Sequence, residues 1–222
     1  MSLVDSKNIV LSSRLVCALA KQTRLPFQIS VSRANTPFDL IHGDVWGPHR
    51  LPTHDGKRFF LTLVDDCSRM TWLFLLHLKS EVSTVIQDLL HLIKSQFNAS
   101  VKVFRSDNGT EFFNAHCREI FKAAAIMHQS SCVHTPQQNG VVERRHRQIL
   151  EVARALRFQG HIPLKFWGFC VQTAAYLINR IPSTVLHGKS PFEVFFDKRP
   201  NVQHLRVLGC LCYATITKDC SD

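Results

Sequence analysis

The amino-acid sequence predicts an α/β protein with a mixed β-sheet layered by helices. The prediction depends on the order of periodic segments along residues 38–160, which reads three strands, helix, strand, helix, strand and helix. This alternation is typical of a sheet covered by helices, and an antiparallel start makes the sheet mixed rather than all parallel. A chain of 222 residues with 45% hydrophobic content is long enough for one domain with a sizeable core and extensions.

The first expected strand ends at an acidic residue. Phe38, Leu40, His42 and Asp44 recur at the two-residue spacing of a strand, so Asp44 is expected at the end of one strand face. His42 lies on the same face and is interpreted as a packed or solvent-facing histidine rather than as part of a site.

Two further β-rich runs, residues 59–64 and 70–78, complete an antiparallel meander. The turn between them begins with Asp65 and Asp66. These carboxylates invite a catalytic interpretation, but acidic turn residues capped by neighbours such as Ser68 are common, and the structural role is favoured.

Three segments then alternate between helix and strand. Residues 80–97 carry apolar side chains at helical spacing, with Ser80 as the expected N-cap. Residues 114–125 predict a second helix, and residues 126–130 a short strand.

A strand at residues 101–106 precedes the second of these helices and stops at a turn signal. Asp107 is therefore expected at a strand end, and Gly109 is expected to let the backbone approach a substrate closely. Glu111 is assigned to local hydrogen bonding between this strand and the following helix.

The last core helix contains Glu143 in its first turns and runs on past Leu156. Two starts are open. Thr135 with Pro136 fits a capping box followed by proline at the first helical position, whereas Asn139–Gly140 is a competing start.

Asp44, Asp107 and Glu143 are the candidate metal-binding and catalytic residues. Two strand ends and one helix would bring the three carboxylates together. Mg²⁺ and Mn²⁺ prefer such oxygen ligands, and two ions about 3.5–4 Å apart can activate a nucleophile and stabilise a leaving oxygen in phosphodiester chemistry. Spacing alone is a weak indication, because most acidic side chains are solvated surface groups.

The net charge of +10 predicts attraction to polyanions. Arg144, Arg145 and Arg147 follow Glu143 directly, and guanidinium groups bind phosphate bidentately without reading base sequence. DNA contact by these arginines, with Gln138 and Asn139 just upstream, is favoured over a solvated basic helix face.

Several motifs in this order resemble one known family, the integrases of Copia-type long-terminal-repeat retrotransposons. The resemblance covers roughly residues 14–214. It is carried by Phe-Asp-Leu-Ile-His-Gly-Asp-Val-Trp-Gly-Pro at 38–48, Asp-Asn-Gly-Thr-Glu-Phe at 107–112, His-Thr-Pro-Gln-Gln-Asn-Gly-Val-Val-Glu-Arg at 134–144, and later blocks at 166–183, 190–193 and 204–210.

The resemblance implies an RNase H-like core with a mixed five-stranded sheet flanked by helices and followed by a C-terminal helical extension. Asp44, Asp107 and Glu143 stand at the family's three metal-ligand positions, which implies two Mg²⁺ or Mn²⁺ ions. The implied activity is that of a polynucleotidyl transferase or endonuclease, joining element DNA 3′ ends to target DNA. Homo-oligomers are implied, because two DNA ends must be joined together.

Three domains are expected: an N-terminal remnant at 1–37, a catalytic core at 38–160 and the helical extension at 161–222. The remnant resembles the end of the family's zinc module. Arg14 stands where the family has its first cysteine, and no histidine precedes Cys17, so no zinc is expected and the segment is expected to be loosely ordered.

The eight cysteines are scattered through apolar runs without a Cys-x-x-Cys pair, which favours reduced, mostly buried thiols. Neither a signal peptide nor an apolar run of membrane-spanning length is visible. A nuclear and cytoplasmic protein without a membrane partner is expected.

Two other functions remain open at this point. The lost zinc ligands and short length fit a catalytically silent or truncated DNA-binding remnant of a retrotransposon polyprotein. The same three carboxylates would also serve a general RNase H-like nuclease, which needs no specific DNA end.

Overall fold

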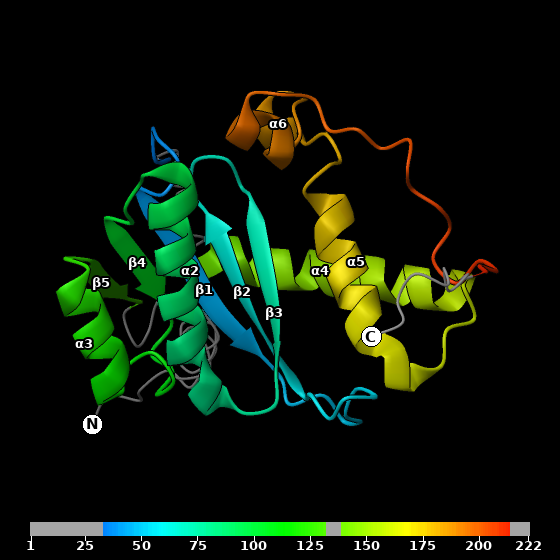
Figure 1. Ribbon diagram of the computed structural model, residues 1–222, viewed down its shortest axis with the longest axis horizontal. Helices are drawn as coiled ribbons and strands as arrows, with labels where there is room; N and C mark the ends of the chain where they lie inside the picture. The colour runs from blue at the N-terminus through cyan, green and yellow to red at the C-terminus, as the bar shows by residue number, and fades with distance from the viewer. Residues whose placement is uncertain (1–32, 132–138, 214–222) are drawn as a thin grey trace, which may run out of the picture. The chain divides into compact units, whose positions relative to one another are not determined.

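The computed structural model describes residues 33–131 and 139–213 and contains one mixed five-stranded sheet in the order β3-β2-β1-β4-β5 (Figure 1). The first three strands pair antiparallel, whereas β4 and β5 run parallel to β1. The fold class predicted from the sequence is therefore confirmed. The strands are β1 Leu40–Trp46, β2 Phe59–Asp65, β3 Thr71–Leu76, β4 Val103–Ser106 and β5 Met127–Ser130.

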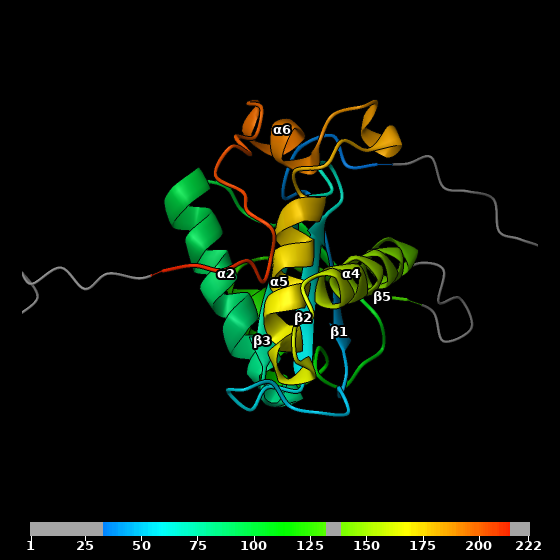
Figure 2. The same ribbon diagram turned by 90° about the vertical axis from the view of Figure 1, so that its right-hand side faces the viewer.

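Helices cover both faces of this sheet (Figure 2). On one face, α2 and α3 bury a core that includes Leu63 and Phe104; on the other, α4 and α5 pack over Phe60. The α-helices are α2 Val82–Phe97, α3 Ala115–Ala123, α4 Gly140–Gln159, α5 Trp167–Ile178 and α6 Pro191–Phe196, with 3₁₀ turns η1 Lys79–Glu81, η3 Leu164–Phe166 and η4 Thr184–Leu186.

The start of one helix differs from the expected start, and the start of another settles which of two expected starts is used. Ser80 is not an N-cap: it lies inside the 3₁₀ turn η1, and α2 begins at Val82 with no side-chain cap. Of the two starts that were open for the helix of Glu143, the structure has Asn139–Gly140, with Asn139 as the cap residue. Thr135 lies outside the described residues.

The acidic turn after β2 has a structural role. Asp65 is fully buried and accepts hydrogen bonds from the Ser68 amide and hydroxyl and from the Phe38 amide. Burial opposes ionisation of Asp66, but hydrogen bonds from His42 and the Ala34 amide hold its pKa below the usual range. His42 is thus a packed histidine, and both carboxylates stabilise the turn.

The thiols are less uniformly buried than expected. Cys67, Cys117 and Cys170 are buried and free, as predicted, but Cys210 and Cys212 are exposed. These two follow α6 in a segment where Leu211 and Tyr213 are exposed as well, so the expectation of mostly buried thiols does not hold there. Cys17, Cys132 and Cys220 lie outside the described residues.

Asn179, just after α5, fastens the C-terminal helices to the free edge of β3. Its side chain is buried, and its amide group donates to the carbonyl of Thr71 and accepts from the amide of the same residue. We expect Asn179→Ala to lower the free energy of unfolding by about 2–4 kcal/mol in urea titrations, because both main-chain groups lose their partner. Gln172→Ala, exposed on α5, should change it by less than about 0.5 kcal/mol.

Candidate active site

Two of the three predicted acids lie at the same level of neighbouring strands: Asp44 is inside β1, two residues before its end, and Asp107 directly follows β4. In the parallel pairing of β1 with β4, Gly43 lies opposite Ser106. Asp44 and Asp107 are the next residues along each chain, so the pairing register brings them side by side. Glu143 lies in the first turn of α4, which packs on β1 and β2.

The pKa of Asp44 indicates that the acids lie near one another. The pKa of Asp44 is raised to about 7, first because the carboxyl is buried and then because Asp107 lies nearby; Glu143 and Glu111 add further repulsion. A hydrogen bond from the Val45 amide opposes the shift without cancelling it. The structure therefore brings together Asp44, Asp107 and Glu143, with Glu111 as a fourth carboxylate.

Asn139 and His146 hold α4 against β1 beside Asp44. The Asn139 amide group donates to the carbonyl of Gly43, and Nδ1 of His146 lies 3.4 Å from Oδ2 of Asp44. Burial lowers the pKa of His146 to about 4, so the imidazole is neutral at pH 7 and this contact is not an ion pair. Asn139 had been predicted to touch DNA; because it is 1% exposed, its role here is to anchor the helix.

Glu111 is more than the local hydrogen-bonding residue that the sequence suggested. Its main-chain carbonyl has that role and accepts from Asn114 and Cys117. Its carboxylate is buried and forms a 2.8 Å ion pair with Lys79 of η1. Sequence reasoning missed Lys79, because a single lysine before a helix carries no motif.

Gly109 fits tightly between two of these carboxylates. A Cβ atom built there would lie 2.7 Å from Oε2 of Glu111 and 2.9 Å from Oδ1 of Asp107, which also accepts a hydrogen bond from the Gly109 amide. Glycine at this position therefore leaves room for the side chains of Asp107 and Glu111, and not only for a substrate.

We expect Gly109→Ala to displace Asp107 and Glu111 and to lower the free energy of unfolding by about 1–3 kcal/mol, as overpacking does. Thermal denaturation measures the loss. Gly188→Ala is the comparison variant. Its added Cβ has no atom within 4 Å but φ is positive there, so it measures the cost of backbone strain without crowding. A Gly109→Ala protein as stable as the native chain would contradict the described packing.

The donor set fits a hard divalent cation, since it consists of carboxylate oxygens whose mutual repulsion a cation would relieve. Across 33–131 and 139–213, however, no three His, Cys, Asp or Glu side chains are arranged closely enough to hold one ion as they stand. Metal binding thus stays a prediction.

The predicted DNA-binding arginines divide between two flanks of α4. Arg147 lies one turn from Glu143 and is exposed, whereas Arg144 and Arg145 line a groove on the other flank. Burial, and then the neighbouring Arg69, lower the pKa of Arg145 to about 10, which leaves it charged at pH 7. Gln138 lies outside the described residues.

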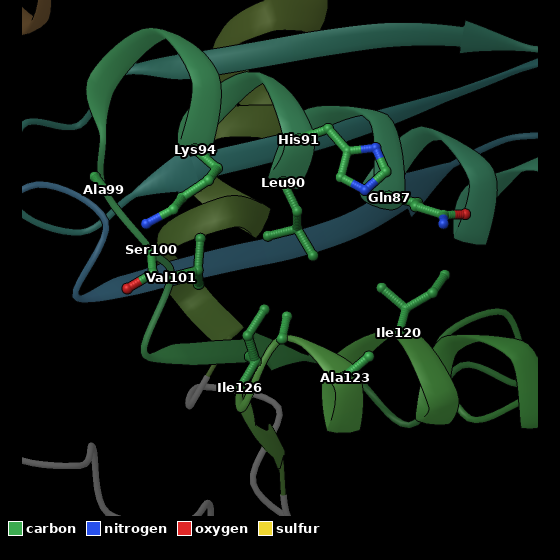
Figure 3. Close-up of a pocket in the computed structure, with 11 residues that line it drawn as sticks. Gln87, Leu90, His91, Lys94, Ala99, Ser100, Val101, Ile120, Ala123 and Ile126 are labelled. Carbon is green, nitrogen blue, oxygen red and sulfur yellow. The ribbon is translucent and has the colours of Figure 1, made fainter.

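A second groove, between α2 and α3, contains none of the predicted site residues. Leu90 and Lys94 of α2 line it opposite Ile120 and Ala123 of α3 (Figure 3). The carboxylates meet α4, which covers the opposite face of the sheet, so this groove is separate from the candidate active site.

The sheet order and its helices define an RNase H-like fold, and solved structures agree. A chain of the simian T-cell lymphotropic virus intasome, solved in complex with the PP2A regulatory subunit B56 gamma, superposes with a TM-score of 0.62 at 16% identity, covering 89% of this chain and 66% of that one. The HTLV-2 integrase catalytic core domain, solved with magnesium in a trimeric form, gives a TM-score of 0.56 at 18% identity, covering 73% and 99%. These likenesses establish the fold.

Sequence comparisons identify the family. Residues 34–136 match the family called integrase core domain. The chain is 37% identical over 203 residues to the retrovirus-related Pol polyprotein from transposon TNT 1-94 of Nicotiana tabacum, and 38% identical over 197 residues to that from transposon RE1 of Arabidopsis thaliana. The chain therefore carries an integrase core domain of the retrotransposon and retroviral kind, which confirms the resemblance drawn from its motifs.

The match covers nearly all of this chain but little of its relatives. It includes 91% and 89% of this chain, and 15% and 13% of the two polyproteins.

No helix among the described residues is long and apolar enough to cross a membrane.

Proposed function

We propose that the chain is the catalytic core of a retrotransposon integrase, which joins element DNA 3′ ends to target DNA in a reaction that depends on Mg²⁺ or Mn²⁺. The observation that carries the proposal is the largely buried Asp44 carboxylate, whose pKa is raised by burial and by the nearby Asp107 and Glu143. Carboxylates crowded in this way repel one another and destabilise the fold. Such clusters are typical of functional sites.

Each residue has a distinct part in the proposal. Asp44 and Asp107 would share the metal ions, and Glu143, at the exposed start of α4, would complete the coordination of one of them. Two bound ions supply activation of an oxygen nucleophile and stabilisation of the leaving oxygen. Lys79 neutralises Glu111, which keeps the fourth carboxylate from adding its full charge to the cluster.

Other parts of the proposal concern the chain as a whole. DNA is the partner, and a homo-oligomer is the working form, as the two solved relatives are an intasome and a trimer. We propose a nuclear and cytoplasmic location, a core at 38–160 and a helical extension at 161–222. The zinc-free remnant at 1–37 falls outside the described residues apart from 33–37.

A joining assay tests the proposal. The chain is incubated with a labelled duplex that carries an element end and with a plasmid target, in Mg²⁺, in Mn²⁺ and in EDTA. We expect joined products with either metal and none in EDTA. Cleavage without end-dependent joining would replace the proposal with a general nuclease, and salt-sensitive DNA binding without any chemistry would replace it with a silent remnant.

A further inference from the structure

A groove of about 460 Å³ lies on the flank of α4 that faces away from Glu143. Its other walls come from the end of α5 and from η4 with the residues before it. From α4 it receives one stripe of side chains at helical spacing, Val141, Arg144, Arg145 and Gln148.

The charged side chains that line the groove are all positive. Arg69, Arg144 and Arg145 line it, and no acidic residue does so among those described. Arg69 is paired with Asp66, but within 33–131 and 139–213 Arg145 donates only to neutral acceptors, Oε1 of Gln148 and the carbonyl of Arg69. Like charges held together in a partly buried wall are costly unless an anion joins them.

We propose that this groove binds the phosphate backbone of a second DNA segment, distinct from the segment that reacts at the carboxylates. Guanidinium forks match phosphate oxygens, and the hydroxyl groups of Ser183 and Thr184 add neutral donors on the opposite wall. Arg145 and Gln148 point away from Glu143 around α4, so the groove is a separate surface from the carboxylates. The proposal takes DNA as the nucleic acid from the proposed function.

An acidic protein segment would also match this charge, but residues 1–32 do not have that composition. Residues 1–32 contain Lys7, Arg14, Lys21 and Arg24 against a single acid, Asp5. Arg33, where the described residues begin, donates to the carbonyls of Cys67 and Val185, and Val185 lines the groove. The composition of residues 1–32 therefore favours an external polyanion as the occupant.

The sharpest variant is Gln148→Glu. A carboxylate at this position accepts the existing 2.8 Å hydrogen bond from Arg145 as an ion pair, so the folded protein should be as stable as the native chain or more so. The new carboxylate also repels phosphate from the groove. Affinity for a 30-base-pair duplex, measured in EDTA by fluorescence anisotropy, should therefore fall about 10-fold. Gln96→Glu, an equal charge change on α2, should change affinity by less than about 2-fold.

A second variant measures the number of phosphate contacts. Arg144→Gln combined with Arg145→Gln should reduce the slope of log Kd against log salt by about 2, whereas Arg118→Gln on α3 should leave it nearly unchanged. Circular dichroism and the melting temperature establish that each variant is folded.

Native-like DNA affinity and salt slope in both groove variants would overturn the inference. So would a poly-glutamate peptide that displaces the duplex at lower charge concentration than competing DNA, because the groove would then be a protein site. Failure of the proposed function looks different: the native chain would join no ends in Mg²⁺ or Mn²⁺, while the groove variants still lost DNA affinity in EDTA.

Discussion

Asp107→Asn should abolish metal-dependent DNA joining while the protein stays folded. Oδ1 of Asp107 accepts a 3.0 Å hydrogen bond from the Gly109 amide, and the side-chain oxygen of asparagine can accept the same bond. The substitution therefore removes the charge and leaves the turn after β4 in place. Without that charge a divalent ion loses a ligand at the point where the reacting oxygens must be stabilised.

The expected loss in joining rate is at least about 1,000-fold, which corresponds to roughly 4 kcal/mol in the barrier. Single-turnover joining in Mg²⁺ and Mn²⁺ measures it, with Asp88→Asn on the exposed side of α2 as the matched control. DNA affinity in EDTA should be unchanged or slightly higher, since a negative charge has been removed. Joining within about 10-fold of the native rate by this variant would remove Asp107 from the catalytic set.

Asp44→Asn should stabilise the metal-free protein at pH 8. The Asp44 carboxyl titrates near 3.8 when unfolded and near 7 when folded. Between these values the folded state keeps a proton that the unfolded state releases, so this carboxyl lowers stability as pH rises from about 4 to about 7, and the penalty persists above pH 7. With the side chain 17% exposed, we expect Asn to raise the free energy of unfolding by about 2–4 kcal/mol at pH 8.

The gain should shrink steadily toward pH 4, which is close to the unfolded pKa of 3.8, and vanish at lower pH, where the native carboxyl is protonated in both states. Urea titrations in EDTA at pH 8, 6 and 4 measure this trend. Adding Mn²⁺ at pH 8 should narrow the gap, because an ion that binds the native cluster stabilises only the folded native chain. Glu119→Gln, exposed on α3, serves as the control. A stabilisation that is the same at every pH would show that Asp44 does not bear the proposed repulsion.

The strands and helices were largely predictable because each has a strong local pattern. Two-residue spacing predicted β1, a β-rich run predicted β2, and helical spacing predicted α2, whose buried Ile86 and Ile93 fall on one face. The start of α2 was not predictable, since Ser80 is a good cap in isolation. Contacts elsewhere, including the Lys79–Glu111 pair, accompany a 3₁₀ turn at that point.

The site was predictable in part. Motifs identified the three acids, whereas the roles of Asn139 and Glu111 depended on burial. Asn139 follows a polar run and reads as a surface residue, yet it is enclosed between α4 and β1. The arginines after Glu143 form one charged run in sequence, but the turn of the helix sends Arg145 into a groove closed by residues almost forty positions later.

By itself the sequence determined the family, the mixed α/β sheet and the identity of the three acids, because periodicity and short motifs are local properties of the chain. Tertiary structure alone decided that Asp44 lies near three other carboxylates, that Lys79 pairs with one of them and that the basic residues of α4 lie on two flanks of the helix. Those outcomes depend on strand register and on the packing of α4 and α5. Electrostatic energies vary with distance and burial, which are known only once the chain is folded.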